Sequence, residues 1–477
     1  MTEILRPDFC VIGGGPGGLA AARMAASLGA QVVLVEKRPL ATMEPVRGAF
    51  QAEILTAAAG TYGHRSSRSG LLEIDARLDF KRLCRDAEGV IARFLREDSP
   101  ARLAGLNVKI IPAAGSFTNR SRFEAGNTAI EAKDFLLTVP SVATAPAIPG
   151  LELVRMLSPE TIADLTLTPK KLVVIGARPA DLMFVQAFLR LGSKAVLFPV
   201  GGLLADEDPE LAEPLIAVLR KEGLEIAGGG RIVAVEPGAA AGSQGGGVKL
   251  TFDDNSTIEA SHLIYAAGRR PRVEGLGLKA ARVNYDKSGV PVSEELRTSN
   301  GRIFAIRDDC DTLHALTNAR SEGEWVARRL FGGAGLRRPL TARIVPTDPE
   351  IASAGLSEAE ARKRYRKVRV WRAGFCDNLR AQTLAQGSRH PLAGHIKIIA
   401  TLQGRLVGAA IVGPQARELI GYFCLALTNG MRMEDFAAFA VNEPRLADVC
   451  QMVALASKSQ NGKALPRRRL ADWFSAR

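Results

Sequence analysis

The chain has 477 residues, 47% of them hydrophobic, and a formal net charge of +13 at pH 7. No uninterrupted apolar run reaches the roughly 18 residues that a membrane-spanning helix needs, and the N-terminus lacks the basic region and apolar core of a signal peptide. These features argue against an integral membrane or secreted protein. We expect a cytoplasmic globular protein of about two to four domains.

Two segments carry much of the basic excess, "RKRYRKVRVWR" (362–372) and "PRRRLADWF" (466–474). No nucleic-acid-binding motif accompanies them, so we expect no nucleic-acid partner and interpret the charge as a solvated basic face. The alternative is a peripheral membrane contact of the basic tail, residues 466–477, in which Trp473 and Phe474 lie beside three arginines.

The cysteines and histidines are scattered along the chain. No Cys-x-x-Cys pair occurs, and no two histidines lie four residues apart as metal ligands on one helix would. The residues are Cys10, Cys84, Cys310, Cys376, Cys424 and Cys450, and His64, His262, His314, His390 and His395. The sequence therefore predicts no metal site, and isolated cysteines are typical of small buried apolar residues.

The first predicted element is a buried strand over residues 8–13, followed by "GGGPGG", a helix and a second strand. Gly13, Gly15 and Gly18 fit the pattern G-x-G-x-x-G, which allows a tight turn, close approach of a diphosphate and close helix–strand packing. The phosphates would lie at the helix N-terminus, where N–H groups and the helix dipole favour negative charge. Glu36 ends the second strand and is placed to bind a ribose. This order of elements predicts a dinucleotide site.

Residues 170–201 repeat this outline, but the key positions differ. Arg178 replaces the second glycine and puts a long side chain where a diphosphate would approach. Asp181 replaces the third glycine and adds a repulsive negative charge, and Phe198 stands where a ribose-binding residue is expected. The sequence thus predicts a retained fold with a degenerate motif, and NAD(P) binding is doubtful.

The two units and four later motifs together resemble a known family. The motifs are "AAGRRP" (266–271), "RIFAIRDD" (302–309), "PTDPEIASAGLSEAEAR" (346–362) and "GHIKIIATLQGRLVGAAIVGPQARELI" (394–420). Over nearly its whole length the chain is similar to the class I pyridine nucleotide-disulfide oxidoreductases, the family of dihydrolipoamide dehydrogenase, glutathione reductase and mercuric reductase. The resemblance implies a homodimer and an α/β fold with an α+β C-terminal domain.

The implied domains are two Rossmann-like units and a dimerisation domain. The FAD-binding domain takes residues 1–150 and 265–335, the NAD(P)-binding-like domain 151–264, and the dimerisation domain 340–465; the tail 466–477 follows. The resemblance implies FAD contacts at Gly13, Gly15, Gly18, Glu36, Gly115, Asp308 and the backbone of Leu316. The chain departs from the family where Arg307 and Pro140 replace two glycines near the expected flavin.

The largest departure is in the residues that relay electrons and protons. The family's two cysteines correspond here to Glu44 and Ala49. Its lysine beside the flavin corresponds to Glu53, and the glutamate partner of that lysine to Met183. Its catalytic histidine corresponds to Glu443, and the glutamate that orients this histidine to Asp448. Thiolate attack requires sulfur, so the resemblance identifies a divergent member that lacks the redox-active cysteine pair. Its catalytic residues are unknown from the sequence.

Three functional hypotheses follow. The first is an FAD-dependent oxidoreductase whose flavin passes electrons directly to a non-disulfide acceptor, such as a quinone, a small oxidant or a redox protein. The alternative is a catalytically inactive relative that acts as a scaffold or regulatory subunit. A thiol-disulfide reductase would need another cysteine near the flavin, and Cys310, two residues after Asp308, is the candidate.

Overall fold

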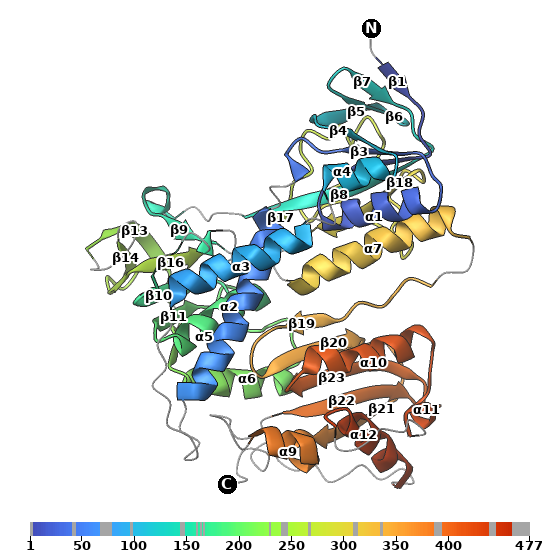
Figure 1. The fold of residues 1–477 in the computed structure, drawn as a ribbon. Coiled ribbons are helices and arrows are strands. Elements are labelled where there is room, and N and C mark those ends of the chain that lie inside the picture. The colour runs from blue at the N-terminus through green and yellow to red at the C-terminus, as the bar shows by residue number, and fades with distance from the viewer. Residues whose placement is uncertain are drawn as a thin grey trace.

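The protein is described here by a computed structural model, in which three bodies each have their own sheet (Figure 1). The structure describes residues 3–40, 44–66, 79–95, 99–143, 148–158, 161–162, 165, 167–228, 230–239, 247–265, 269–308, 313–333, 337–385, 394–437 and 445–459. Two α/β units and a C-terminal α+β domain confirm the predicted fold class.

The first unit is a parallel sheet built from two segments of the chain. Its strands are β2 (Phe9–Ile12), β3 (Val32–Val35), β4 (Val108–Ile111), β8 (Asp134–Ala143) and β18 (Ile303–Asp308). The order is β4-β3-β2-β8, and β18 pairs with β8 so that Ile303 lies opposite Phe135. β17 (Arg269–Pro271) pairs with the far end of β8. The chain therefore leaves this unit after β8 and returns to it some 120 residues later, after building the second unit.

Two layers cover the first sheet. One face packs against α1 (Pro16–Ser27) and α7 (Leu313–Phe331), and the other against a small sheet. The small sheet consists of β1 (Glu3–Leu5), β5 (Gly115–Asn119), β6 (Arg122–Ala125) and β7 (Thr128–Ile130). Because parallel strands are buried on both faces, β2 and β3 are apolar throughout, as the sequence predicted.

The second unit repeats this architecture. Its parallel sheet consists of β9 (Met156–Leu157), β10 (Lys171–Ile175), β11 (Lys194–Phe198), β12 (Leu224–Ile226) and β16 (His262–Tyr265), in the order β12-β11-β10-β16-β9. The covering elements are α5 (Pro179–Arg190), α6 (Pro209–Lys221), β13 (Ile232–Gly238), β14 (Gly247–Phe252) and β15 (Thr257–Ala260). A 3-10 turn, η3 (Leu151–Leu153), packs beside β13.

The C-terminal domain is an antiparallel sheet with helices on both faces. Its strands are β19 (Arg343–Val345), β20 (Glu350–Gly355), β21 (Val368–Gly374), β22 (His395–Thr401) and β23 (Leu406–Gly413), in the order β19-β20-β23-β22-β21. One face packs against η5 (Phe375–Asp377), α9 (Leu379–Ala385), α10 (Ala416–Thr428), α11 (Met433–Ala437) and α12 (Asp448–Ser459). The opposite face packs against α8 (Glu358–Arg364) and the second unit.

The long helix α2 (Glu44–Ser66) connects the first unit to the second (Figure 1). Its buried residues Ala52 and Leu55 share a core with Met183 of α5, and α3 (Phe80–Leu95) lies beside it. The short helix α4 (Pro100–Gly105) precedes β4. Within the described residues, no helix combines the length and the apolar character needed to cross a bilayer.

Buried polar groups hold the second unit against the C-terminal domain. Gln186 of α5 donates from Nε2 to the carbonyl oxygen of Asp348 (2.7 Å) and accepts from its N–H (2.7 Å). Arg190, only 8% exposed at its side chain, binds Glu222 (2.7 Å) and the Asp348 carboxylate (3.0 Å). A paired buried polar group is costly to separate, so α5 is fixed to the segment that leads into β20.

A second contact is a charge network beneath the C-terminal sheet. Lys397 of β22, 3% exposed at its side chain, binds Asp208 (2.6 Å), Glu358 (2.8 Å) and Glu210 (2.9 Å). Arg372 of β21 binds Glu210 and Glu358 as well. Burial alone would lower the pKa of Lys397, but its three carboxylate partners outweigh burial and raise that pKa. The network joins α6 and its cap to the sheet.

Glu210 should make this contact sensitive to acid. Burial alone would raise its pKa, but hydrogen bonds from Arg372 and Lys397 lower it to about 2. A carboxylate with a depressed folded pKa stabilises the fold above its unfolded pKa of about 4.3, and this stabilisation is lost as pH falls toward 2. Glu210→Gln should therefore lower the free energy of unfolding by about 2 kcal/mol at pH 7, measured by urea unfolding. The account fails if the difference from wild type is as large at pH 2.5 as at pH 7.

Candidate functional site

The first glycine turn requires glycine for mechanical reasons. Gly13 follows β2, has φ +110°, and donates its N–H to the carbonyl oxygen of Val35 (2.9 Å). A Cβ there would lie 2.2 Å from Thr138 Oγ1, and a Cβ on Gly18 would lie 2.1 Å from the Gly13 carbonyl oxygen. Both distances are far below van der Waals contact, so the tight turn and the close helix–strand approach predicted from the sequence are present.

Two side chains hold this turn in place. The buried Thr138 hydroxyl donates to the carbonyl oxygens of Ile12 (3.1 Å) and Gly13 (3.0 Å). The Glu36 carboxylate accepts from the N–H groups of Gly14 (2.8 Å) and Arg38 (2.9 Å). Glu36 thus already binds the turn, and its remaining lone pairs are available to a ribose. Thr138 was not identified from the sequence, although a hydroxyl inside the apolar run "DFLLTV" is a signal that could have found it.

The N-terminus of α1 has no side-chain cap among the described residues. Gly15 precedes the helix with an extended backbone, and the N–H of Leu19 is the first to donate within it, to Gly15 (2.9 Å). In the part of the chain that the structure describes, no side chain caps α1 and no acidic residue lies in its first turn. The first turn of α1 therefore has no negative group of its own, and the chemistry of this helix end suits a diphosphate such as that of FAD.

The other positions implied for FAD are less informative. Gly115 begins β5, and a Cβ there would lie 2.4 Å from Cε1 of Phe123, so packing alone requires glycine. Asp308 ends β18 opposite Pro140 of β8, and Leu316 lies in α7. The side chains of Asp308, Pro140, Arg307 and Leu316 fall outside the described part of the structure. These positions stay predictions.

The second unit has the same glycine turn, but a carboxylate of the chain lies at the start of the helix that follows it. Gly176 has φ +132° and donates to the carbonyl oxygen of Phe198 (2.9 Å), as Gly13 does to Val35 in the first unit. Here, however, Asp181 is fully buried in the first turn of α5. Its carboxylate accepts from the backbone N–H of Arg178 (2.9 Å), from Nε (3.2 Å) and from a terminal guanidinium nitrogen (3.0 Å).

An internal carboxylate thus occupies the helix end that would bind a phosphate. Arg178 and Asp181, which the sequence predicts to obstruct the site, pair with each other. Phe198, 9% exposed, stacks on Phe252 of β14 with ring centroids 5.0 Å apart. At the start of α5 the acceptor is thus a carboxylate of the chain itself, and Phe198 packs in the core shared by the sheet and β14.

The positions that the resemblance assigns to the relay lie in α2, in α5 beside it and in α12, where the structure describes them. Ala49 is fully buried in α2, and Met183 is buried in α5. Glu44 begins α2, but its side chain is outside the described residues, as are Glu443 and Cys310 entirely. Asp448 begins α12 and accepts from the backbone N–H of Arg445 (2.9 Å), the contact of a helix-capping carboxylate.

Glu53, at the position of the family's lysine, binds an arginine from another domain. Arg417 of α10 binds Glu53 through its guanidinium, and its backbone N–H donates to Glu350 (3.0 Å) while Nε binds the same carboxylate. Burial raises the pKa of Glu350, and Arg417 only partly offsets this. Sequence reasoning missed this contact because its partners lie more than 360 residues apart.

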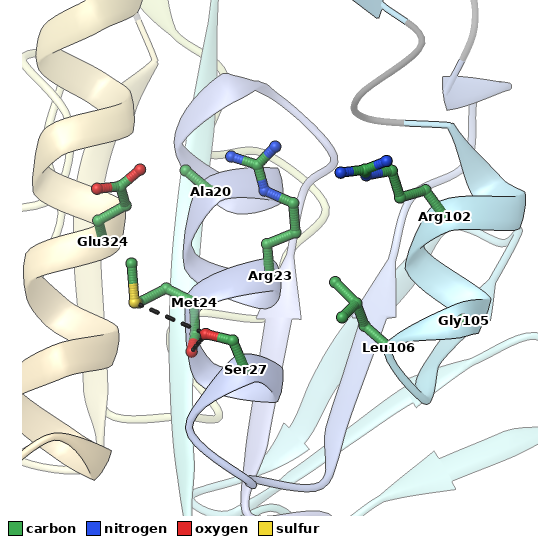
Figure 2. Close-up of a pocket in the computed structure, with 8 residues that line it drawn as sticks. All are labelled: Ala20, Arg23, Met24, Ser27, Arg102, Gly105, Leu106 and Glu324. Carbon is green, nitrogen blue, oxygen red and sulfur yellow. Dashed lines mark hydrogen bonds between the residues drawn. The ribbon is translucent and has the colours of Figure 1, made fainter.

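A shallow hollow of about 510 Å³ lies on the outer side of α1. Figure 2 shows Arg102 of α4 extending toward α1 from one side and Glu324 of α7 facing it from the other, with Arg23 and Met24 between them. The hollow borders the C-terminal half of α1 rather than the glycine turn, so it is separate from the nucleotide site. Among the described residues, no group of three His, Cys, Asp or Glu side chains is arranged to hold a metal ion.

Comparisons with known proteins agree on one family. Residues 7–323 match the family model described as pyridine nucleotide-disulphide oxidoreductase, and residues 341–454 match the model of its dimerisation domain. The chain is 30% identical to a dihydrolipoyl dehydrogenase from Thermus scotoductus, over 92% of this chain and 95% of that protein. It is 29% identical to a glutathione reductase from Burkholderia cepacia, over 92% and 97% of the two chains.

A mercuric reductase from Streptomyces lividans is also 29% identical, over 90% of this chain and 92% of that protein. Among solved structures, the HOCl-induced flavoprotein disulfide reductase from Escherichia coli superimposes with a TM-score of 0.77. That comparison covers 94% of this chain and 99% of the other at 18% identity, so it supports the fold alone.

A substitution that adds one methyl group tests whether the turn of the first unit requires glycine. Gly18→Ala should lower the free energy of unfolding by about 2 kcal/mol and reduce flavin content, because the new Cβ meets backbone that cannot move aside. Gly89→Ala in α3 is the control: nothing lies within 4 Å of its Cβ, and alanine should stabilise that helix by about 0.5–1 kcal/mol. Unfolding curves and the ratio of visible to ultraviolet absorbance give both readouts. Equal behaviour of the two variants would contradict the assignment.

Proposed function

The chain belongs to the pyridine nucleotide-disulphide oxidoreductase family, and we propose that within it the protein is an FAD-dependent oxidoreductase that passes electrons to a non-disulfide acceptor. The observation that carries this proposal is the contrast between the two helix N-termini. Within the described structure, the start of α1 has no side-chain cap and no acidic residue, whereas the Asp181 carboxylate lies at the corresponding start of α5. One cofactor site is kept and the other is closed.

FAD is assigned to the first unit through Gly13, Gly15, Gly18 and Glu36. The backbone N–H groups at the start of α1 bind the diphosphate and Glu36 binds a ribose, while Thr138 keeps the turn fixed before the cofactor arrives. When bound, FAD supplies the redox chemistry. The role of these residues is to bind and orient it.

NAD(P) is doubted as the electron donor for a physical reason. A diphosphate would have to displace the Asp181 carboxylate from three hydrogen bonds with Arg178 and leave that carboxylate buried beside a second anion. Burying an unpaired charge is strongly unfavourable. Phe198 offers no group that binds a ribose hydroxyl.

A thiol relay is not part of the proposal. Glu44 and Ala49 stand where the resemblance places the cysteine pair, and the five described cysteines form no disulfide with one another. Burial raises the pKa of the Cys10 thiol and brings that of Cys450 to about 12. Thiols of this kind supply little thiolate near neutral pH. Cys310 is left as an untested candidate.

The second candidate function is a catalytically inactive scaffold or regulatory subunit. The polar contacts that fix α5 and α6 to the C-terminal domain favour it, because they make the second unit a rigid support. The two functions differ in their need for flavin. The oxidoreductase requires bound flavin, so a colourless pure protein would exclude that function.

A homodimer is proposed for this chain, which carries the family's dimerisation domain. The helical layer of that domain exposes several large apolar side chains: Leu379 (62%), Tyr422 (39%), Leu425 (64%) and Leu455 (49%). Apolar side chains gathered on one layer are typical of a protein–protein interface.

Anaerobic mixing of the pure protein with reduced coenzymes tests the donor. We expect a flavin spectrum that NADH and NADPH leave unchanged, because the second unit is closed by Asp181. Dithionite should bleach the same sample, which shows that the flavin is reducible. Rapid bleaching by either coenzyme would contradict the proposal.

Sedimentation velocity tests the dimer. Leu425→Arg should shift the protein toward monomers, because a buried arginine without a partner is costly at an interface. Leu153→Arg is a matched control, since Leu153 is 67% exposed but lies in η3 of the second unit. Dimers of unchanged affinity in the Leu425 variant would refute this interface.

A further inference from the structure

One end of the C-terminal sheet carries a group of cations that we call the basic rim. Its members are exposed arginines and lysines from α8, the start of β21 and two neighbouring turns: Arg364, Arg366, Lys367, Arg369, Arg405 and Arg432. Within the described residues, none of the six side chains takes part in an ion pair. This differs from the cations beneath the same sheet, such as Lys397 and Arg372, which are fully paired.

Backbone pairing gathers these residues at one place. Val368 of β21 lies opposite Thr401 of β22, which places Lys367 beside the turn that joins β22 to β23. That turn contains Arg405, whose backbone forms an isolated bridge with Arg432. Residues from three distant parts of the domain therefore meet at the same end of the sheet.

Three acidic residues from α8 and the start of α11 do little to neutralise the rim. The Glu360 carboxylate caps α8 by accepting from the N–H (2.8 Å) and hydroxyl (2.7 Å) of Ser357. Asp435 accepts from the backbone N–H of Arg432 (2.7 Å). Glu434 is the other exposed acid of that turn. Six cations against these three acids leave a net positive surface.

An apolar side chain projects from the same turn. Leu402 is 45% exposed and lies in the same turn as Arg405, between Thr401 and Arg405. Cations beside an exposed leucine match the two parts of a lipid surface, anionic headgroups and acyl chains. We propose that the basic rim docks the protein on an anionic phospholipid membrane, with Leu402 entering the headgroup region.

Two other roles for these side chains are nucleic-acid binding and protection of the sheet edge, and both fit the side chains less well than membrane docking does. A single-strand nucleic-acid surface needs exposed aromatic rings for stacking, but Tyr365, the aromatic residue beside the rim, packs against the core of Ile399 and Val407. Cations on the edge strand β21 can also serve to prevent pairing with another sheet. That role does not account for Arg405 and Arg432, which lie away from the edge.

Vesicle flotation with the full-length protein tests the proposal. We expect binding to vesicles of phosphatidylcholine mixed with phosphatidylglycerol, little binding to phosphatidylcholine alone, and release when salt rises from about 0.05 to about 0.5 M. One basic residue near such a surface changes partitioning about fivefold. Arg366→Glu/Lys367→Glu should thus weaken binding at least about tenfold, and Leu402→Ser should weaken it without changing the charge.

A matched control makes the same charge change elsewhere. Lys279 and Lys287 are exposed residues of the first unit, so Lys279→Glu/Lys287→Glu should bind vesicles like wild type. Thermal unfolding of each variant verifies the fold. Equal binding by the rim and control variants overturns the proposal, as does the absence of binding by wild type.

Two further experiments test whether the basic tail, or a preference for nucleic acid, accounts for the binding instead of the basic rim. Arg467→Glu/Arg468→Glu/Arg469→Glu alters the tail, and loss of binding in this variant but not in the rim variant would overturn the role of the rim. A double-stranded DNA oligonucleotide is added as competitor, and preference for DNA over anionic vesicles would also overturn the proposal. These outcomes do not depend on flavin reduction, so the test is independent of the proposed enzymatic function.

Discussion

Both nucleotide-binding units depend on one constraint: the first turn of a helix presents N–H groups without partners in the helix, and a negative group is favoured there. In the first unit α1 has no such group of its own among the described residues, so a ligand can supply it. In the second unit Asp181 supplies it from within the chain, and Arg178 neutralises the carboxylate. In the first unit a bound ligand would supply the negative group, whereas in the second unit the chain's own Asp181 supplies it. This difference is the physical basis of our proposal that the chain binds FAD in the first unit and does not bind NAD(P) in the second.

Polar contacts also fix the second unit to the C-terminal domain. Gln186 and Arg190 attach α5 to the segment before β20, and Lys397 joins α6 to the C-terminal sheet. The helix α2, which would carry the cysteine pair according to the resemblance, is linked to the C-terminal domain through Glu53 and Arg417. Glu53, at one of the positions that the resemblance assigns to the relay, therefore forms a contact between domains. Such a contact stabilises the arrangement of the three bodies.

The sequence predicted the local features well, because they depend on residues close together in the chain. The fold class, the glycine turn at Gly13 and the altered motif at Arg178 are examples, while the domain limits and the cofactor-contacting residues stay predictions. Long-range partners could not be predicted: nothing near Glu53 points to Arg417, and nothing near Asp181 shows that its carboxylate is buried rather than exposed. Lys397 is an intermediate case, since a lysine within the apolar strand "HIKIIAT" indicates a buried charge but does not identify its three acidic partners.

The central claim is that Asp181 occupies the phosphate position of the second unit. The most direct test is calorimetric titration of the flavin-saturated protein with ADP-ribose, which has the diphosphate and ribose of the coenzyme but cannot be reduced. We predict no saturable binding to wild type and measurable binding to Asp181→Gly, in which the start of α5 and the freed Arg178 both face the ligand. Tight binding to wild type, or none to either protein under conditions where both are folded, would contradict this account.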